Sequence, residues 1–247
     1  MLVGPSAPHK HQLLLEVYHL LNDEAIMDAS AWDREHYQRN AMVTQVLPNL
    51  LGKKAPNMGD VIIVSDVDEI PRPETIDLLR NCDFPERVDI RSKFFPYSFQ
   101  LHRTDGEWYH PQATYWRGNE TILPESLRMT QVAYEFKNAA WHCTTCFSSL
   151  AEFVAKINAF SHQEWNRAEF KDPDQIVRRV RTGVDLFDRG FPYQKVPENE
   201  MDVPSYLLKH KQKFTYLLDR EPANANFRDY VPPMTDDDSY DKSDELS

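Results

Sequence analysis

Cysteine is scarce in this chain of 247 residues, which contains three. Cys82, Cys143 and Cys146 are too few for a disulfide framework and cannot complete a Cys-only tetrahedral zinc site. The spacing Cys143-x-x-Cys146 lacks the second pair that would indicate zinc. A local disulfide, a redox pair and two buried thiols all stay open for it, and we favour a structural role.

Long apolar runs are absent as well. No stretch approaches the roughly 18 consecutive apolar residues that a membrane-spanning helix needs. Residues 1–15 do not show the charged start and apolar core of a signal peptide. We therefore expect a soluble chain with no membrane segment.

Basic residues are outnumbered by acidic ones, 28 against 39, which gives a formal net charge of −11. This balance argues against a nucleic-acid surface, because such a surface normally shows as a basic patch. Part of the acid lies in residues 235–247, which are polar and like-charged, so we expect a disordered tail without a catalytic role. The overall hydrophobic content of 41% is enough for one sizeable core.

The strongest local signal is an acidic cluster that follows an apolar run. Residues 61–64 read Val-Ile-Ile-Val, which is typical of a central parallel strand buried on both faces. Asp66 and Asp68 follow it, and carboxylates at the carboxyl end of such a strand open onto the ligand crevice of an α/β sheet. Hard cations prefer oxygen ligands and often bind protein carboxylates and substrate phosphates together. The pair predicts a divalent metal that holds a phosphate; the alternative is an acidic turn that only ends a strand.

Helix signals surround this cluster. Pro73 suits a first helical position, with Ile76, Leu78 and Leu79 on the buried face, so strand, acidic tip, loop and helix make half of a Rossmann-like α/β unit. Capping patterns and apolar periodicity predict four further helices. These are residues 12–21, the segment from Ser30 through residues 32–39 that Pro48 ends, a segment that opens at Ser149 and Glu152, and one that opens at Asp172-Pro173. A last helix is expected over residues 205–218.

Charged residues on two of these helices could serve phosphates. Those of segment 32–39, among them Glu35 and Arg39, form either a solvated face or a face toward phosphates, and periodicity favours solvent. The helix that opens at Asp172 carries basic residues that could neutralise a diphosphate or could equally face solvent. They are Arg178, Arg179 and Arg181.

Strands and aromatic residues fill the middle of the chain. Strands are expected in residues 88–101 and 132–136, with His142 on the loop before the next helix. A lone histidine is more often a hydrogen-bonded structural residue than a ligand. Between the strands, an aromatic segment is typical of an irregular active-site loop, whose rings could stack on a sugar or could equally fill a core. The rings are Trp108, Tyr109, His110, Tyr115 and Trp116.

Several short motifs in order carry a resemblance to a known family. They are WDREHYQR at 32–39, SDVDEIP at 65–71, NAAWHCTTCF at 138–147, FSH at 160–162, VRTG at 180–183, PSYLLK at 204–209 and YLLDR at 216–220. With this order, over roughly residues 32–230, the chain resembles glycosyltransferase family 17. An ordered set of motifs is far more specific than a single Asp-x-Asp pair.

The resemblance implies a fold and a reaction. The fold is α/β, a GT-A-like Rossmann-type mixed sheet flanked by helices. The reaction is an inverting transfer of N-acetylglucosamine from UDP-N-acetylglucosamine to a β-linked mannose of an N-glycan, with Mn²⁺ or Mg²⁺ at Asp66 and Asp68. His142 becomes a further contact to the metal or the diphosphate, beside Arg178 and Arg181. The resemblance also implies placement in the Golgi.

We expect three parts in the chain. Residues 1–31 form a divergent helix and linker, residues 32–230 the glycosyltransferase domain, and residues 231–247 the acidic tail. The first Rossmann-like strand and the membrane anchor of the family are not found in residues 1–31, so the sheet is expected to have an exposed edge.

Inversion by single displacement needs a base on the far side of the sugar. The candidates are Glu69, Glu120, Glu152 and Asp188, of which we retain Glu69 and Asp188 as catalytic. Candidate acceptor-binding rings are Trp108, Tyr115 and Trp116. Two alternatives stay open: a non-catalytic carbohydrate-binding remnant of the family, and a nucleotidyl- or phosphotransferase that uses the same carboxylate pair.

Overall fold

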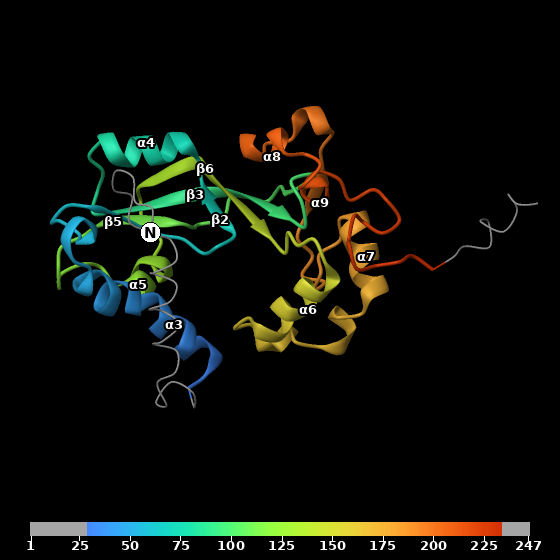
Figure 1. Cartoon of the computed structure of the whole chain (residues 1–247), viewed down its shortest axis with the longest axis horizontal. Helices are drawn as coiled ribbons and strands as arrows, with labels where there is room; N and C mark the ends of the chain where they lie inside the picture. Colours follow the sequence, from blue (N-terminus) through green and yellow to red (C-terminus); the bar gives the residue numbers. More distant parts are fainter. Residues whose placement is uncertain (1–28, 234–247) are drawn as a thin grey trace, which may run out of the picture.

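The structure is a computed structural model that describes residues 29–233, and it has the expected α/β class. The predicted helix 12–21 and the predicted tail 235–247 lie outside the described residues. A mixed five-stranded sheet has the order β1-β5-β3-β6-β2, in which β3 and β6 are parallel and the other pairs are antiparallel (Figure 1). Its strands are β1 (Val61–Val64), β2 (Glu69–Pro71), β3 (Arg87–Pro96), β5 (Gln112–Tyr115) and β6 (Glu135–Thr144).

Strand β1 is the first point at which the prediction needs correction. Its two central residues are buried, Ile62 against Val43, Leu47 and Trp116, and Ile63 in a separate cluster with Leu79. However, β1 pairs only with β5 in the described part of the chain, in the antiparallel sense, at an edge of the sheet. A run of β-branched apolar residues indicates that both faces of a strand are covered. It does not indicate whether the strand is parallel or antiparallel to its neighbours, or whether it lies at the centre or the edge of the sheet.

The acidic cluster lies where the chain crosses the sheet. β5 pairs with the first residues of β3, whereas β2 pairs with the later part of β6. Residues 65–68 therefore connect two opposite edges in one short step. The crossing is possible because the long strands β3 and β6 carry different neighbours at their two ends.

Helix α4 (Pro73–Asn81) follows β2 with Pro73 in its first turn, as predicted. Thr75 and Leu79 are buried, but Leu78 is 48% exposed, which corrects the predicted buried face. A nine-residue helix presents one narrow stripe to the sheet, and Leu78 falls beside it. In Figure 1, α4 lies on one side of the sheet, and α3 (Ala31–Ala41) and α5 (Pro124–Met129) lie on the other.

The capping predictions for three helices are confirmed. Reciprocal capping boxes join Ser30 to Asp33 at the start of α3 and Ser149 to Glu152 at the start of α6 (Leu150–Ala159). α3 continues into a π turn (Met42–Val46) and a 3₁₀ turn (Leu47–Asn49). Asp172 caps α7 (Pro173–Thr182), which ends at Gly183 in the left-handed conformation, where a Cβ atom would lie 2.9 Å from Leu101.

Three other predictions are corrected. The aromatic segment is not one irregular loop, since β5 runs through it, and His142 lies within β6 and not on a loop after it. The predicted helix 205–218 is two short helices, α8 (Ser205–Lys209) and α9 (Thr215–Leu218), because a basic turn separates its apolar residues into two anchors. A small second sheet pairs β4 (Leu101–Arg103) with β7 (Tyr193–Lys195).

Separate apolar clusters fill the two ends of the molecule. One lies between the five-stranded sheet and α4, and a larger one joins α6, α7 and the segment around Phe227. Arg220 lies at the larger cluster, 1% exposed, and donates to the carbonyl oxygens of Tyr97, Phe147 and Ala225. Backbone acceptors satisfy this buried guanidinium and fix three chain segments relative to one another.

Candidate functional site

Asp66 and Asp68 occupy the crossing between β1 and β2. Two backbone hydrogen bonds hold the crossing, Glu69 N to Asp66 O at 3.0 Å and Cys143 N to Asp68 O at 3.0 Å. The side chains are 43% and 23% exposed, respectively, so both reach the surface. The crossing thus presents two carboxylates on a fixed backbone.

Asp66 is held by two arginines. Its Oδ2 atom lies 2.9 Å from Arg128 Nη2 and 3.4 Å from Arg39 Nη2. Burial raises the pKa of Asp66, and this effect exceeds the opposing effect of the neighbouring Arg128 charge.

Asp68 has a different pair of partners. Its Oδ2 atom accepts from Lys156 Nζ at 2.9 Å and lies 3.7 Å from His142 Nε2. Burial by itself would raise the pKa of Asp68, but His142 and Lys156 outweigh burial and hold the pKa well below its usual value. Asp68 is therefore an ionised carboxylate at neutral pH.

Glu69 is buried beneath this pair, at 4% exposure. Arg128 donates to both of its carboxylate oxygens at 2.9 Å, and Trp108 Nε1 donates to Oε1 at 2.9 Å. Burial would raise the pKa of Glu69, but the hydrogen bonds and charge of Arg128 lower it. With both oxygens in use, this candidate base instead orients Arg128 and Trp108.

His142 faces Glu69 across the β2–β6 pair. Its ring packs against Phe94 and Trp108, with centroid distances of 4.8 and 5.2 Å. Its Nδ1 atom is buried without a hydrogen-bond partner among residues 29–233, while Nε2 is directed to Asp68. The structure therefore places His142 beside Asp68 and Trp108 beside Glu69 and His142.

Helix α3 contributes further charged residues to the site, although its periodicity had favoured a face exposed to solvent. Arg39 contacts Glu35 at 2.5 Å and Glu125 of α5 at 3.1 Å, besides Asp66. The second carboxylate oxygen of Glu35, Oε2, accepts a hydrogen bond from the hydroxyl group of Ser161, in the segment after α6. Side chains from four of the sequence motifs thus form one connected acidic site: 32–39, 65–71, 138–147 and, through the Ser161–Glu35 contact, 160–162.

Sequence reasoning missed three members of this site, Glu125, Arg128 and Lys156. Arg128 lies in a six-residue helix and Lys156 on the partly exposed side of an amphipathic one. Neither position differs in sequence from an ordinary solvated cation. The one available signal was that each is next to a buried apolar residue, since Arg128 follows Leu127 and Lys156 precedes Ile157. This pattern is too common to be diagnostic.

The site as a whole is short of positive charge. The residues that these contacts link include five carboxylates and three permanent cations, a formal charge of −2 when the histidines are neutral. The carboxylates are Glu35, Asp66, Asp68, Glu69 and Glu125, and the cations are Arg39, Arg128 and Lys156. A divalent cation would balance this charge.

The residues also fit a metal that is shared with a substrate. Within residues 29–233, every hydrogen bond and ion pair of the Asp66 and Asp68 carboxylates uses Oδ2, so Oδ1 of each remains available as a ligand. No group of three or more His, Cys, Asp or Glu in this part of the chain could form a metal cage by itself. Two carboxylates completed by substrate phosphates are a common arrangement for Mg²⁺.

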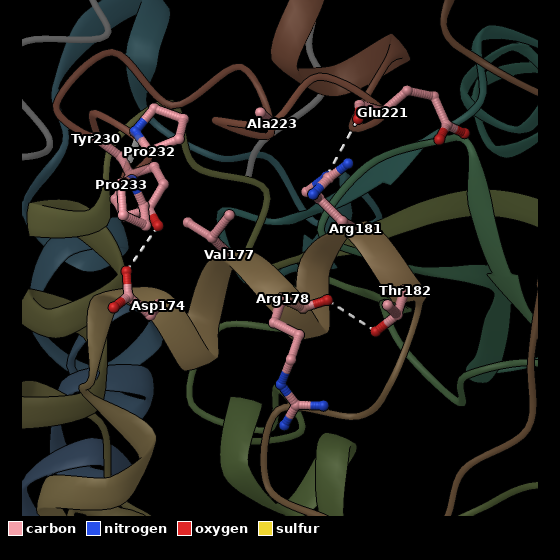
Figure 2. A pocket seen from close by; sticks show the side chains of 10 residues that line it. All are labelled: Asp174, Val177, Arg178, Arg181, Thr182, Glu221, Ala223, Tyr230, Pro232 and Pro233. Carbon is pink, nitrogen blue, oxygen red and sulfur yellow. Dashed lines mark hydrogen bonds between the residues drawn. The ribbon is translucent and has the colours of Figure 1, made fainter. Parts of the chain in front are cut away.

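Three predicted site residues lie elsewhere. Arg178 and Arg181 line a separate pocket of about 420 Å³ beside α7 (Figure 2), where Arg178 donates to Gln175 and Arg181 to the Glu221 carbonyl. Neither contacts the acidic pair in the described structure. Asp188 is a 60% exposed partner of Arg179.

The two remaining aromatic candidates are packing residues. Tyr115 stacks on Phe84 at 4.3 Å between centroids and donates its hydroxyl to the Phe84 carbonyl. Trp116 is 7% exposed and packs on Ile62. Of the three acceptor candidates, Trp108 is the one that contacts residues of the acidic site, Glu69 and His142.

A disulfide lies at the edge of the site. Cys143 and Cys146 are joined at the end of β6, directly after His142, so the structural role favoured for this pair takes the form of a local disulfide. Cys143 is also the residue whose backbone N–H holds Asp68.

Comparison with known proteins agrees with the sequence motifs. The sequence profile of glycosyltransferase family 17 matches residues 10–224. The chain belongs to this family. Its matched region thus includes every motif that supplies a side chain to the acidic site.

Curated family 17 relatives are distant in sequence. They include the β-1,4-mannosyl-glycoprotein 4-β-N-acetylglucosaminyltransferases of Rattus norvegicus and Mus musculus, each 25% identical over 227 residues that cover 78% of this chain and 41% of the relative. The Homo sapiens protein of the same name is 25% identical over 218 residues, 76% of this chain and 40% of the relative. The chain thus spans about two fifths of the length of these relatives. No solved structure gives a significant match.

Among residues 29–233, no helix combines the length and the apolar content needed to span a membrane.

Proposed function

We propose that this family 17 chain is an inverting glycosyltransferase that moves N-acetylglucosamine from UDP-N-acetylglucosamine to a β-linked mannose of an N-glycan. The observation that carries the proposal is the convergence of four family motifs on one acidic, surface-reaching site. The names of the relatives support the donor sugar and the acceptor. Placement in the Golgi is part of the same proposal.

Asp66 and Asp68 would hold Mn²⁺ or Mg²⁺ through their Oδ1 atoms. Bound there with the donor, the ion would act as a Lewis acid that stabilises negative charge on the diphosphate. The formal charge of −2 supports a divalent ion over a monovalent one. His142, whose Nε2 is directed to Asp68, is the further candidate contact.

The cations of the site are suited to the leaving group. Breaking the bond between sugar and diphosphate develops negative charge on the departing oxygen. Arg39 lies at Asp66 and Lys156 lies at Asp68. Both cations have flexible side chains, of which that of Arg39 is 19% exposed and that of Lys156 is 30% exposed. Arg128, which Glu69 fixes, keeps a third positive charge nearby. We assign diphosphate binding to this group, since Arg178 and Arg181 line a different pocket.

Trp108 is the ring best placed for the acceptor. It packs beside His142 and Phe94, and Glu69 fixes its orientation through Nε1. An indole face held in this way offers an apolar surface for the C–H groups of a sugar. We propose that the acceptor mannose packs on it.

Thermal unfolding with UDP and Mn²⁺ tests the proposal. A ligand at about 100 times its Kd stabilises a protein by about 2.7 kcal/mol, which raises the Tm of a domain of this size by roughly 5–10 °C. Asp68→Ala should abolish the shift, whereas Asp77→Ala, an exposed carboxylate on α4, should keep it.

Other outcomes identify the alternatives. An unchanged melting curve for the unmutated protein would favour the carbohydrate-binding remnant. Release of pyrophosphate in place of UDP from a sugar nucleotide would favour the nucleotidyltransferase.

A further inference from the structure

Lys156 differs from the other cations of the site in how it is held. Arg128 has a side chain that is 5% exposed and is tied to Glu69 by two hydrogen bonds. Lys156 is 30% exposed, and among the described residues Asp68 is its one carboxylate partner. An ammonium group on a flexible four-carbon stem can leave that partner with no change in the fold.

The backbone that carries the Asp68 carboxylate is, in contrast, held in place. The Asp68 carbonyl accepts from Cys143 N, and β2 begins at the next residue. α6 is also fixed, because a capping box holds its start and Phe153 and Ile157 are buried in the largest apolar cluster. Movement at this contact is therefore a matter of side chains, of which that of Lys156 is the longer and more flexible.

Asp68 is also one of the two carboxylates to which the proposed function assigns the metal. A divalent ion on Asp68 and an ammonium group 2.9 Å from Asp68 Oδ2 would repel each other strongly at such a separation. The nearest new acceptors for a displaced ammonium group would be phosphate oxygens, which a nucleoside diphosphate supplies at the same place.

We propose that Lys156 is an internal counter-cation of Asp68 that couples metal binding to donor binding. It opposes a metal ion that arrives alone, and it binds the diphosphate when metal and nucleoside diphosphate arrive together. The inference rests on the proposed function. Its consequence is that each of the two ligands strengthens the binding of the other, by the same factor in both directions.

Metal titrations of the whole chain test this inference without any measurement of transfer. Free Mn²⁺ is followed by electron paramagnetic resonance, with and without saturating UDP. Lys156→Gln should bind Mn²⁺ alone roughly three- to tenfold more tightly, because the competing charge is gone. The same variant should bind UDP in the presence of Mn²⁺ roughly tenfold more weakly, so the coupling between the ligands falls.

Two further variants separate charge from damage. Lys156→Arg keeps a cation near Asp68, so its affinity for Mn²⁺ alone should stay near that of the unmutated protein. Lys137→Gln removes an exposed lysine that pairs with Glu135 at 3.3 Å, away from the site, and should leave both affinities unchanged.

Failure of the inference can be told from failure of the function. If the unmutated protein binds neither Mn²⁺ nor UDP with Mn²⁺, the proposed function is overturned. If it binds both, but Lys156→Gln shows unchanged or weaker affinity for Mn²⁺ alone, the counter-cation role of Lys156 is overturned and the function stands.

Discussion

At the scale of single residues, three neighbouring carboxylates have three different environments. Asp66 contacts arginines and has a raised pKa, Asp68 contacts a lysine and has a lowered one, and Glu69 is buried against Arg128. Adjacent positions differ in this way because the chain changes direction at the crossing and then enters β2. The first two can serve a ligand, whereas the third orients their surroundings.

Loss of Arg128 should show how strongly the buried pair depends on both partners. Arg128→Met leaves the Glu69 carboxylate, whose side chain alone is 1% exposed, without its cation, and we expect a loss of about 3–5 kcal/mol in the free energy of unfolding. Urea denaturation measures this loss. The double variant Glu69→Gln with Arg128→Met should recover part of it, since no unpaired charge remains. A single-variant loss below 1 kcal/mol would contradict the assignment.

At the scale of elements, the sequence predicted those features, such as the starts of helices, that depend on residues close together in the chain. The starts of α3, α6 and α7 were predicted because a capping side chain and the backbone it binds are three residues apart. The edge position of β1 and the place of His142 within β6 were not, because strand partners are distant in sequence. Likewise, the acidic pair could be found from its motif, but its partners Arg128 and Lys156 could not, because contact with Asp66 and Asp68 depends on how α5 and α6 pack.

The segment after α7 offers a pH-dependent test at the same scale. Asp185 is 4% exposed and lies between α7 and β7, where it accepts from Arg189 at 2.6 Å and from the Tyr193 hydroxyl at 2.9 Å. Burial would raise the pKa of Asp185, but the hydrogen bonds of Arg189 outweigh burial and lower it below the usual 3.8.

A lowered pKa in the folded state stabilises the fold when the carboxylate is ionised. The contribution of Asp185 should therefore be complete above pH about 4 and should disappear as the pH falls through its lower folded value. Asp185→Asn should cost about 1–3 kcal/mol at pH 7 and progressively less below pH 4. Urea denaturation at several pH values measures the difference, and a cost that does not change with pH would refute this account.

At the scale of the whole molecule, the acidic site joins elements that are far apart in the sequence. α3 and α5 lie on one side of the acidic pair and α6 on the other, and these elements meet at Asp66, Asp68 and the Glu35–Ser161 contact. The pocket with Arg178 and Arg181 involves α7 and the segment that ends near Pro233. A bound donor would therefore affect different elements in the two locations.

Hydrogen exchange can identify the donor location. UDP with Mn²⁺ should slow amide exchange in α3, residues 65–69 and the second half of α6, because a ligand at the acidic pair opposes their local opening. Exchange in α7 should not change. Slower exchange in α7 alone would place the diphosphate on Arg178 and Arg181 and would overturn our assignment.

The disulfide between Cys143 and Cys146 has a practical consequence for all of these experiments. The cytosol of a common bacterial host keeps thiols reduced through glutathione and thioredoxin, whereas secretory compartments let such bonds form. A sample made in a reducing host would contain two free thiols beside His142 and next to the backbone that holds Asp68. Production by secretion or in an oxidising strain is therefore the appropriate source of protein for ligand titrations.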